Sequence, residues 1–373
     1  MIYLDNSATT KPCPQAIRAA TEAMETTWGN PSSLHDLGIA AERTLRTARQ
    51  QVAQALGCEA DRVFFTSGGT EADNWAIFSA AERLKKRGNH IITTQIEHHA
   101  VLHPVEHLAQ QGFEVTYLAP DRDGRVSLEA LQKALRPDTI LVSVMLVNNE
   151  SGAVQPIESM AKLTHRRCPN AIFHTDAVQA LFHVPLRAQT LGADLISVSG
   201  HKVHALKGAG ALYIRRGLSL PPFLHGGGQE GGYRSGTEAI PAIAAFGAAC
   251  AALQPTAITD MAQMRANKEL LRQRLEQIPG VALIGGVDAP HIQSLAVAGL
   301  RSQGLINCLQ DLDVYVSAGS ACAKGHRSHV LEAMGVDPEL IDGAIRVSLS
   351  RETTEEEINR FAEALQTAIA RLN

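Results

Sequence analysis

The chain has 373 residues, 45% of them hydrophobic, and a formal net charge of −4 at pH 7. This length predicts about two domains, and the lack of a basic excess argues against a nucleic-acid-binding protein. The N-terminus resembles no signal peptide, and we expect no apolar run long enough to span a membrane. The six cysteines form no CxxC pair and no zinc-finger spacing with histidine, which favours a reducing cytoplasm and no metal site.

Strands and helices are expected to alternate from about residue 60 to residue 215. This alternation is typical of an α/β fold, with a three-layer large domain built on a mostly parallel sheet. A long helical stretch follows, and later strands indicate a smaller α+β domain. We therefore expect a large domain over residues 13–250, and a small domain made of residues 1–12 and 251–373.

Two short apolar runs, residues 172–175 and 195–198, are each followed by polar residues that suit one cofactor. The first run leads to Asp176 and the second leads to Lys202. Ligands bind at the carboxyl ends of the strands in open parallel sheets. Pyridoxal phosphate needs a lysine for its Schiff base and an acid that keeps its pyridinium nitrogen protonated. The alternative is a salt-bridged pair at the rim of the sheet.

A second pattern suits the phosphate group of that cofactor. Residues 62–66 read as a buried strand, and Gly68, Gly69 and Thr70 follow it directly before a helix. The unpaired N–H groups at a helix N-terminus attract anions, and glycines let the backbone approach the ligand. An ordinary turn capped by Thr70 explains this stretch equally well.

Other polar residues follow predicted strands in the same region. His98 follows the strand at residues 90–94 and would stack on a flat ring, and Asn149 follows the strand at residues 139–145. Each also has a simpler explanation, as a residue of a helix start or a turn. Several strands that lead to residues suited to one phosphorylated aromatic ring are stronger evidence than any single motif.

Cys322 differs from the other five cysteines. Its neighbours are small, so its thiol is expected to be accessible, and Lys324, His326 and Arg327 follow it closely. Positive charge lowers the pKa of a thiol and favours the thiolate nucleophile. An inert surface thiol is the alternative, but beside a pyridoxal phosphate site we favour a nucleophile.

Taken together, the chain resembles the cysteine desulfurase family, the NifS/IscS-like branch of the fold-type I (class V aminotransferase) pyridoxal phosphate enzymes. The resemblance covers nearly the whole chain. It rests on motifs at residues 3–10, 29–33, 66–74, 97–98, 147–150, 176–179, 199–202, 234–237 and 320–322.

The resemblance implies a role for each matching residue. The catalytic residues would be Lys202, which bonds to the cofactor and acts as base, the persulfide carrier Cys322, and the proton donor His98. The cofactor-binding residues would be Gly69, Thr70, His98, Asn149, Asp176, Gln179, Ser199, His201, Lys202 and, from the neighbouring subunit, Thr237. The substrate-binding residues would be Asn30, Asn149 and Arg346.

The implied reaction converts L-cysteine to L-alanine and leaves its sulfur as a persulfide on the enzyme. The sulfur would then pass to an acceptor protein, either an iron–sulfur scaffold or a thiolation enzyme. The family also implies a homodimer, whose large domain binds the cofactor and whose small domain carries the Cys322 loop.

The chain departs from the family pattern at three places. Gly69 replaces the usual alanine of the phosphate turn, and His204, Ala205 and Leu206 replace the residues that commonly follow the lysine. The loop after Cys322 is somewhat short, which leaves the acceptor open. The competing functions are a selenocysteine lyase, an aminotransferase and a catalytically inactive scaffold protein.

Overall fold

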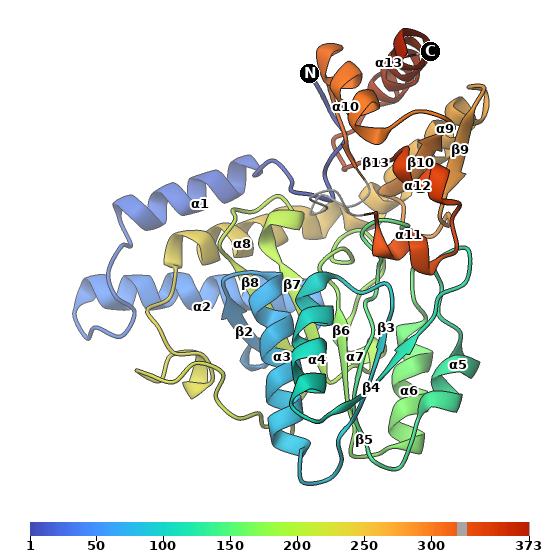
Figure 1. Cartoon of the computed structure of the whole chain (residues 1–373). Coiled ribbons are helices and arrows are strands. Elements are labelled where there is room, and N and C mark those ends of the chain that lie inside the picture. Colours follow the sequence, from blue (N-terminus) through green and yellow to red (C-terminus); the bar gives the residue numbers. More distant parts are fainter. Residues whose placement is uncertain (319–326, 373) are drawn as a thin grey trace.

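The computed structural model describes residues 1–318 and 327–372, and the largest sheet in them has seven strands (Figure 1). Strand β8 is antiparallel to both of its neighbours, and all other adjacent pairs are parallel. The predicted mostly parallel sheet is therefore confirmed. In spatial order the strands are β2 (Val63–Thr66), β8 (Gly210–Ile214), β7 (Leu195–Ser199), β6 (Ile172–Asp176), β5 (Thr139–Ser143), β3 (His90–Thr94) and β4 (Glu114–Leu118).

Helices cover both faces of this sheet, as expected for strands with apolar residues on both sides. Successive strand residues point to opposite layers, so Ile91 packs with the first layer and Ile92 with the second. The first layer contains α3 (Gly69–Leu84) and α4 (His99–Gln110). The second contains α2 (Asp36–Leu56), α6 (Ile157–Arg167), α7 (Ala188–Leu191) and α8 (Ile240–Leu253), with α1 (Pro14–Glu25) and α5 (Leu128–Ala134) packed against the same cluster.

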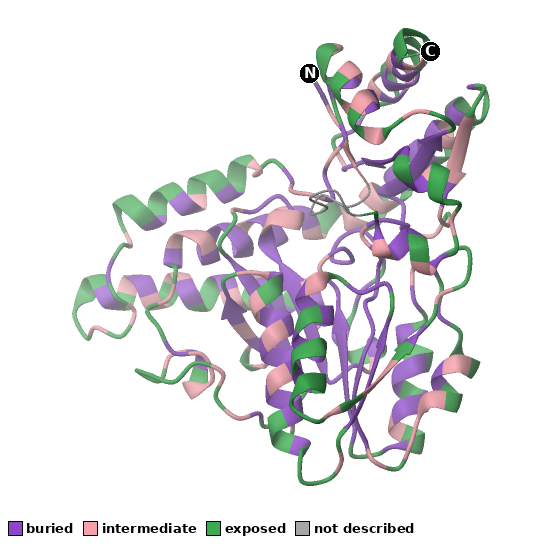
Figure 2. Ribbon diagram, viewed as in Figure 1, coloured by how far each residue is buried: buried purple, intermediate pink, exposed green. Residues whose placement is uncertain are grey.

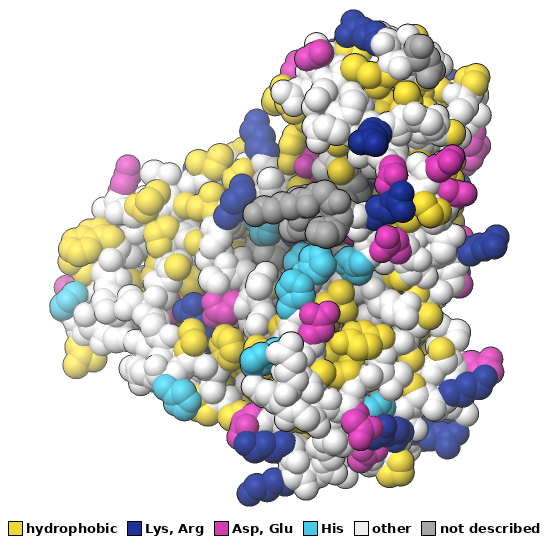
Figure 3. Space-filling view, viewed as in Figure 1, with side chains coloured by type: hydrophobic (Ala, Val, Ile, Leu, Met, Phe, Trp, Pro, Cys, Tyr) yellow, Lys and Arg dark blue, Asp and Glu magenta, His cyan; other side chains and the backbone are white. Residues whose placement is uncertain are grey.

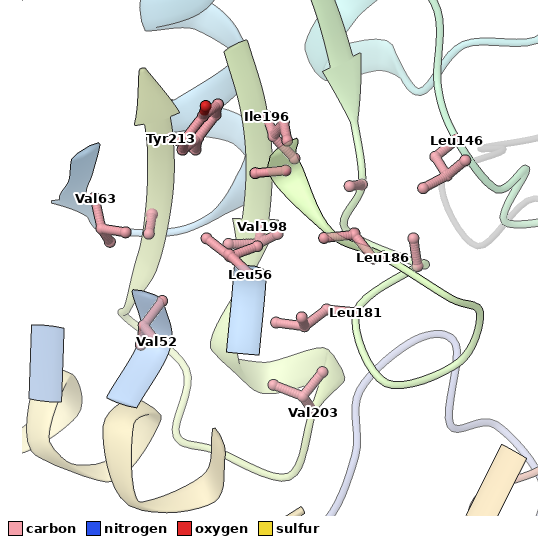
Figure 4. Close-up of a cluster of buried hydrophobic side chains, with 14 of the residues drawn as sticks. Val52, Leu56, Val63, Leu146, Leu181, Leu186, Ile196, Val198, Val203 and Tyr213 are labelled. Carbon is pink, nitrogen blue, oxygen red and sulfur yellow. The ribbon is translucent and has the colours of Figure 1, made fainter. Parts of the chain in front are cut away.

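The hydrophobic core of the second layer is shown in Figure 4. Val52 and Leu56 of α2 pack toward Val63, Val198 and neighbouring strand residues. Figure 2 shows that the central strands of the large sheet are buried along their length, whereas the edge strand β4 is partly exposed. Burial of these side chains stabilises the fold by roughly 1.5–3 kcal/mol each.

One helical run, Ile240–Glu276, is long and apolar enough for a membrane span by length and composition. This differs from the expectation that no run would reach that length. The apolar part is α8, whose Ile243, Phe246 and Leu253 are buried in the core. Its continuation, α9 (Ala257–Glu276), carries many charged residues. A buried core helix accounts for the composition.

The remaining chain forms a second unit with its own core. Its antiparallel sheet consists of β12 (Ser317–Ala318), β13 (Ala344–Ser348), β10 (Ile292–Val297) and β9 (Val281–Ile284), and β1 (Ile2–Tyr3) pairs in parallel with β11 (Val314–Tyr315). The helices that follow β10 in the chain are α10 (Ser302–Asp311), α11 (His329–Ala333), α12 (Pro338–Asp342) and α13 (Glu355–Leu372). The N-terminal strand thus joins the C-terminal part of the chain. The exact division at residues 13 and 251 stays a prediction.

Candidate active site

A cavity of about 310 Å³ lies where the carboxyl ends of the large sheet's parallel strands meet the second unit. Ten of the predicted site residues line it. They are Gly69, Thr70, His98, Asn149, Asp176, Gln179, Ser199, His201, Lys202 and Arg346. The fold explains this convergence, because β2, β3, β5, β6 and β7 all run in the same direction and end at this edge.

Lys202 ends a short 3₁₀ turn (Gly200–Lys202) that follows β7 directly. Its Nζ atom donates to the carbonyl oxygens of Ser7, at 2.5 Å, and Ala8, at 2.8 Å. Burial lowers the pKa of Lys202 to about 8, with a further decrease from the charge of Arg346. Near neutral pH a usable fraction of the amine is therefore unprotonated, as a nucleophile or base requires.

Asp176 is buried at the end of β6, and its Oδ1 atom accepts a hydrogen bond from the backbone N–H of Val178 at 2.8 Å. Burial raises the pKa of Asp176 to about 7, and the nearby Asp73 raises it further. Asp73 also lines the cavity, and burial raises its pKa to about 7. Behind the two carboxyls, the His174 ring lies between the hydroxyls of Ser143 and Ser197. A cation at this end of the cavity would stabilise both carboxylates.

Two further buried carboxyls line the cavity. Glu97 Oε1 accepts from the hydroxyl of Thr94 and the backbone N–H of Met145. Burial raises the pKa of Glu97 to about 8. Glu150 accepts a hydrogen bond from the hydroxyl of Ser328, and burial raises the pKa of Glu150 to about 7. The wall of the cavity thus contains acids that hold protons near neutral pH.

The N-terminus of α3 opens onto the cavity. The helix begins at Gly69 with Gly68 as N-cap, so the alternative in which Thr70 caps the helix is wrong. A Cβ atom on Gly69 would lie 2.6 Å from Cγ2 of Val178, so a methyl group there would force the Val178 side chain to shift. The buried hydroxyl of Ser199 has no hydrogen-bond partner among the described residues. Free helix N–H groups and an unpaired hydroxyl form an anion site.

His98 is the N-cap residue of α4, and its Nδ1 atom accepts a hydrogen bond from the backbone N–H of Ala100 at 3.1 Å. The proton of the neutral ring is therefore on Nε2. One side of the ring is open to the cavity, yet burial and then the charge of Lys202 lower the pKa of His98 to about 4. Similarly, burial and Lys202 lower the pKa of His201 to about 4.

Arg346 lies on β13 in the opposite wall and is 3% exposed. Its guanidinium donates to the backbone carbonyl of Asn149, to the carboxylate of Asp5 and to the hydroxyl of Ser317. The buried Nε atom has no partner among the described residues. A guanidinium with donor capacity left over suits a planar carboxylate.

Three predicted residues are not brought to this cavity. Asn30 is exposed, and its side chain accepts a hydrogen bond from the backbone N–H of Ser32, as in an ordinary turn. Thr237 is exposed outside the cavity of its own chain. Cys322 lies outside the described residues. The roles of all three stay predictions.

Sequence reasoning missed several residues of the wall, among them Asp73, Glu97, Glu150 and His329, as well as the carbonyls of Ser7 and Ala8. Asp73 and Glu97 belong to the motifs at residues 66–74 and 97–98, in which roles were assigned only to neighbouring residues. Their spacing from Thr70 and His98 was the only available signal. The backbone carbonyls carry no signal in the sequence.

Pyridoxal phosphate fits this set of groups. Its phosphate matches the helix N-terminus and the unpaired Ser199 hydroxyl, and its protonated ring nitrogen would place a positive charge beside the buried carboxyls of Asp176 and Asp73. Lys202 supplies an amine of lowered pKa. The donor set therefore covers both ends of the cofactor and its reactive carbonyl.

Comparison with known proteins gives consistent results. The class-V aminotransferase family matches residues 2–361. A cysteine desulfurase IscS from Methanosarcina thermophila is 41% identical over 100% of this chain and 92% of its own length. A solved NifS-like protein superposes with a TM-score of 0.94 at 36% identity, with 100% of both chains covered. A structure of SspA in complex with cysteine gives a TM-score of 0.82 at 31% identity, covering 95% of this chain and 100% of the other.

Proposed function

The chain belongs to the class-V aminotransferase family and is a pyridoxal phosphate-dependent cysteine desulfurase, and from this premise we propose how its residues share the reaction. The proposal rests mainly on one observation. Lys202, Asp176 and the N-terminus of α3 converge on a single cavity, and Arg346 faces it from the opposite wall.

Within this cavity, Lys202 would bond to the cofactor, Asp176 would pair with its ring nitrogen, and His98 would stack on the ring. The phosphate would be bound by Gly69, Thr70, Ser199 and His201, and the phenolic oxygen by Asn149 and Gln179. When bound, pyridoxal phosphate supplies an electron sink that makes the bonds at Cα and Cβ of an amino acid easier to break.

The substrate, L-cysteine, would be held by its carboxylate at Arg346. The amine of Lys202, with its pKa lowered to about 8, would remove the Cα proton. His98 carries its ring proton on Nε2 and would donate it within the cavity. Because burial lowers the pKa of His98 to about 4, the resting ring is neutral, and loss of its Nε2 proton would leave a transient imidazolate that takes a proton back from solvent.

The sulfur would then pass to Cys322. Its thiolate attacks the sulfur of the substrate, so that the S–S bond forms while the Cβ–S bond breaks. The electron pair of the broken bond stays with the carbon, which gains a proton and becomes the methyl group of alanine. The persulfide left on Cys322 carries the sulfur to an acceptor, an iron–sulfur scaffold or a thiolation enzyme.

The experiment compares the wild type with Cys322→Ala and Lys202→Ala. We expect the wild type to have a visible cofactor band and to release alanine from L-cysteine. Cys322→Ala should keep the band and release little alanine, whereas Lys202→Ala should lack the wild-type band. Equal alanine release by Cys322→Ala would contradict the persulfide route and favour a selenocysteine lyase-like reaction.

A homodimer is part of the proposal. Large hydrophobic side chains are exposed on α1, on α2 and on the loop between them, and Figure 3 shows hydrophobic side chains gathered over this region. The most exposed are Leu34 at 94% and Trp28 at 64%. Patches of this kind mark protein interfaces. A second copy that covers them would also bring Thr237, exposed on its own chain, to the neighbouring phosphate site.

Leu34→Asp combined with Trp28→Asp should convert a dimer into monomers in sedimentation experiments. The matched control is Ile258→Asp, a similar change at a side chain that is 80% exposed on α9. Monomers in the wild type, or dimers in the double variant, would contradict the assignment of this surface. A cytoplasmic location remains a prediction from the sequence.

A further inference from the structure

His204, two residues after Lys202, has an unusual backbone conformation. Its φ angle is 59°, in the left-handed region that side chains other than glycine rarely adopt, and the residue is 4% exposed. Such a conformation costs of order 1–3 kcal/mol and persists only where surrounding contacts hold it. The family resemblance gives this histidine no role, and it does not line the cavity.

Three hydrogen bonds tie His204 to the N-terminal segment, residues 7–13. The backbone N–H of His204 donates to the hydroxyl of Thr10 at 2.7 Å, and its Nδ1 atom donates to the carbonyl of Lys11 at 2.9 Å. Its own carbonyl accepts from the backbone N–H of Cys13 at 2.8 Å. Burial lowers the pKa of His204, so the ring is neutral and Nδ1 carries its proton.

The same N-terminal segment holds the catalytic lysine. The carbonyls of Ser7 and Ala8 accept from Nζ of Lys202, and the Ser7 carbonyl also accepts from Nε2 of Gln179 at 2.9 Å. Thr10 adds a link on the His204 side, because both its backbone N–H and its hydroxyl donate to the carbonyl of His201. Residues 7–13 therefore lie along the turn that carries Lys202 and enclose its amine.

We propose that His204 is a positioning residue for Lys202: by binding residues 10–13 it fixes the two backbone carbonyls that hold the lysine amine. The inference rests on the role of Lys202 given above. It concerns how the amine is presented to the cofactor and to the substrate, since His204 contacts neither.

Loss of this contact should change how Lys202 titrates. Among the described residues, the charged groups that face the amine are Arg346, Asp5 and Asp176, and the rings near it are those of His98, His183, His201 and His291. Burial is the largest cause of its low pKa. If residues 7–13 move away, water reaches the ammonium group, so the pKa of Lys202 should rise from about 8 toward the ordinary 10.5.

The experiment measures how fast the cofactor-free protein captures pyridoxal phosphate, followed by absorbance across the pH range in which the amine titrates. Free pyridoxal phosphate titrates in the same way in every experiment. A difference between two variants in how the capture rate depends on pH therefore comes from the protein. For His204→Ala we expect the midpoint of the curve of capture rate against pH to lie about one pH unit above that of the wild type. Capture should be about ten-fold slower near pH 7 and equally fast at high pH, where the amine is neutral in both proteins.

His204→Asn is the conservative variant, since asparagine tolerates a positive φ and its amide can donate to Lys11, and it should restore the wild-type profile. Thr10→Val removes the hydroxyl that accepts from the backbone N–H of His204, so it should shift the pH curve as His204→Ala does. It provides the test if His204→Ala folds poorly. The control is Met264→Ala, which cuts a buried side chain beside His204 and should lower stability without moving the midpoint.

Superposed profiles for His204→Ala, Thr10→Val and the wild type would overturn the proposal, and so would a shift of equal size in Met264→Ala. Lys202→Ala separates this failure from that of the proposed function. If Lys202→Ala captures the cofactor with the wild-type band, the assignment of Lys202 itself fails. If it does not, while the His204 variants match the wild type, only the positioning role fails.

Discussion

The guanidinium of Arg346 donates to the hydroxyl of Ser317 at 2.9 Å, and Ser317 stands two positions before the segment of residues 319–326 that contains Cys322. The two residues are direct partners in the β12–β13 ladder. On the other side of that segment, Ser328 donates to Glu150, and His329 donates to the carbonyl of Glu97. The residues on both sides of the segment that contains Cys322 are thus hydrogen-bonded to the wall of the cavity.

Ser317→Ala should weaken the hold on Arg346. A hydrogen bond to a charged group contributes about 1.5–3 kcal/mol, but two other partners of Arg346 remain, so we expect KM for L-cysteine to rise only about five-fold. The cofactor band should be unchanged, because Ser317 does not line the cavity. Steady-state kinetics would measure KM for L-cysteine in both variants, with Ser302→Ala at the start of α10 as the control. An unchanged KM would contradict the proposed role of Arg346 in carboxylate binding.

Gly69→Ala should impair cofactor binding. The added Cβ would lie 2.6 Å from Cγ2 of the stiff Val178 side chain. Overpacking of this kind costs about 1–3 kcal/mol, so the Kd for pyridoxal phosphate should rise about ten-fold or more. Gly68→Ala is the matched control, since the nearest atom to its added Cβ is the Ser199 hydroxyl at 4.0 Å. Equal affinities for the two variants would show that the close packing at Gly69 is unimportant.

Glu97→Gln should change how the stability of the cofactor-free protein depends on pH. Burial raises the pKa of Glu97 from 4.5 to about 8, so the folded protein keeps a proton that the unfolded chain releases between these values. The contribution of Glu97 to stability is therefore present below pH 4.5 and is lost as the pH rises through about 8.

Glutamine keeps the acceptor for the backbone N–H of Met145 and does not titrate. The gain in unfolding free energy of Glu97→Gln over the wild type should therefore grow as the pH rises from 4.5 to about 8, as measured by chemical denaturation. Glu129→Gln, at an exposed residue of α5, should produce no such trend. A constant difference at all pH values would refute the assignment of a buried proton to Glu97.

Glu230→Gln should destabilise the fold around the loop that carries Thr237. Glu230 is buried with a φ of 50°, and its carboxylate accepts two hydrogen bonds from Arg49 and one from the backbone N–H of Phe65. Removing one partner of a buried ion pair costs about 3–5 kcal/mol, which thermal unfolding would detect. The control is Glu59→Gln, whose exposed pair with Arg216 contributes at most about 1 kcal/mol. Equal shifts of Tm would contradict this prediction.

The sequence predicted the layers of the fold well, because hydrophobic strands that alternate with helices leave few alternatives. It also placed Asp176, Lys202 and Gly69 correctly at strand ends, where local order alone brings them to one edge. At the start of the last helix, Thr354 and Glu357 form a capping box with reciprocal hydrogen bonds, a motif that depends only on residues close in sequence.

The sequence did not predict what depends on contacts between distant segments. The carbonyls of Ser7 and Ala8 are groups that every residue possesses, so their use by Lys202, 195 and 194 positions later, leaves no trace in the sequence. The acids at Asp73 and Glu97 looked like ordinary helix and turn residues. Only the assembled cavity shows that both are buried and that, within the described part of the chain, neither pairs with a lysine or an arginine.

The joining of the two ends of the chain has a consequence for biosynthesis. The backbone N–H of Ser7 donates to the hydroxyl of Ser348, 341 positions later, and Ile2 pairs with Val314 across two strands. During translation, the lysine and its acid leave the ribosome long before β13 exists to hold the N-terminal residues over them. The enclosure around the amine can therefore close only after β13 has been synthesised, and a nascent chain that still lacks β13 would present an open pocket to the vitamin-derived cofactor.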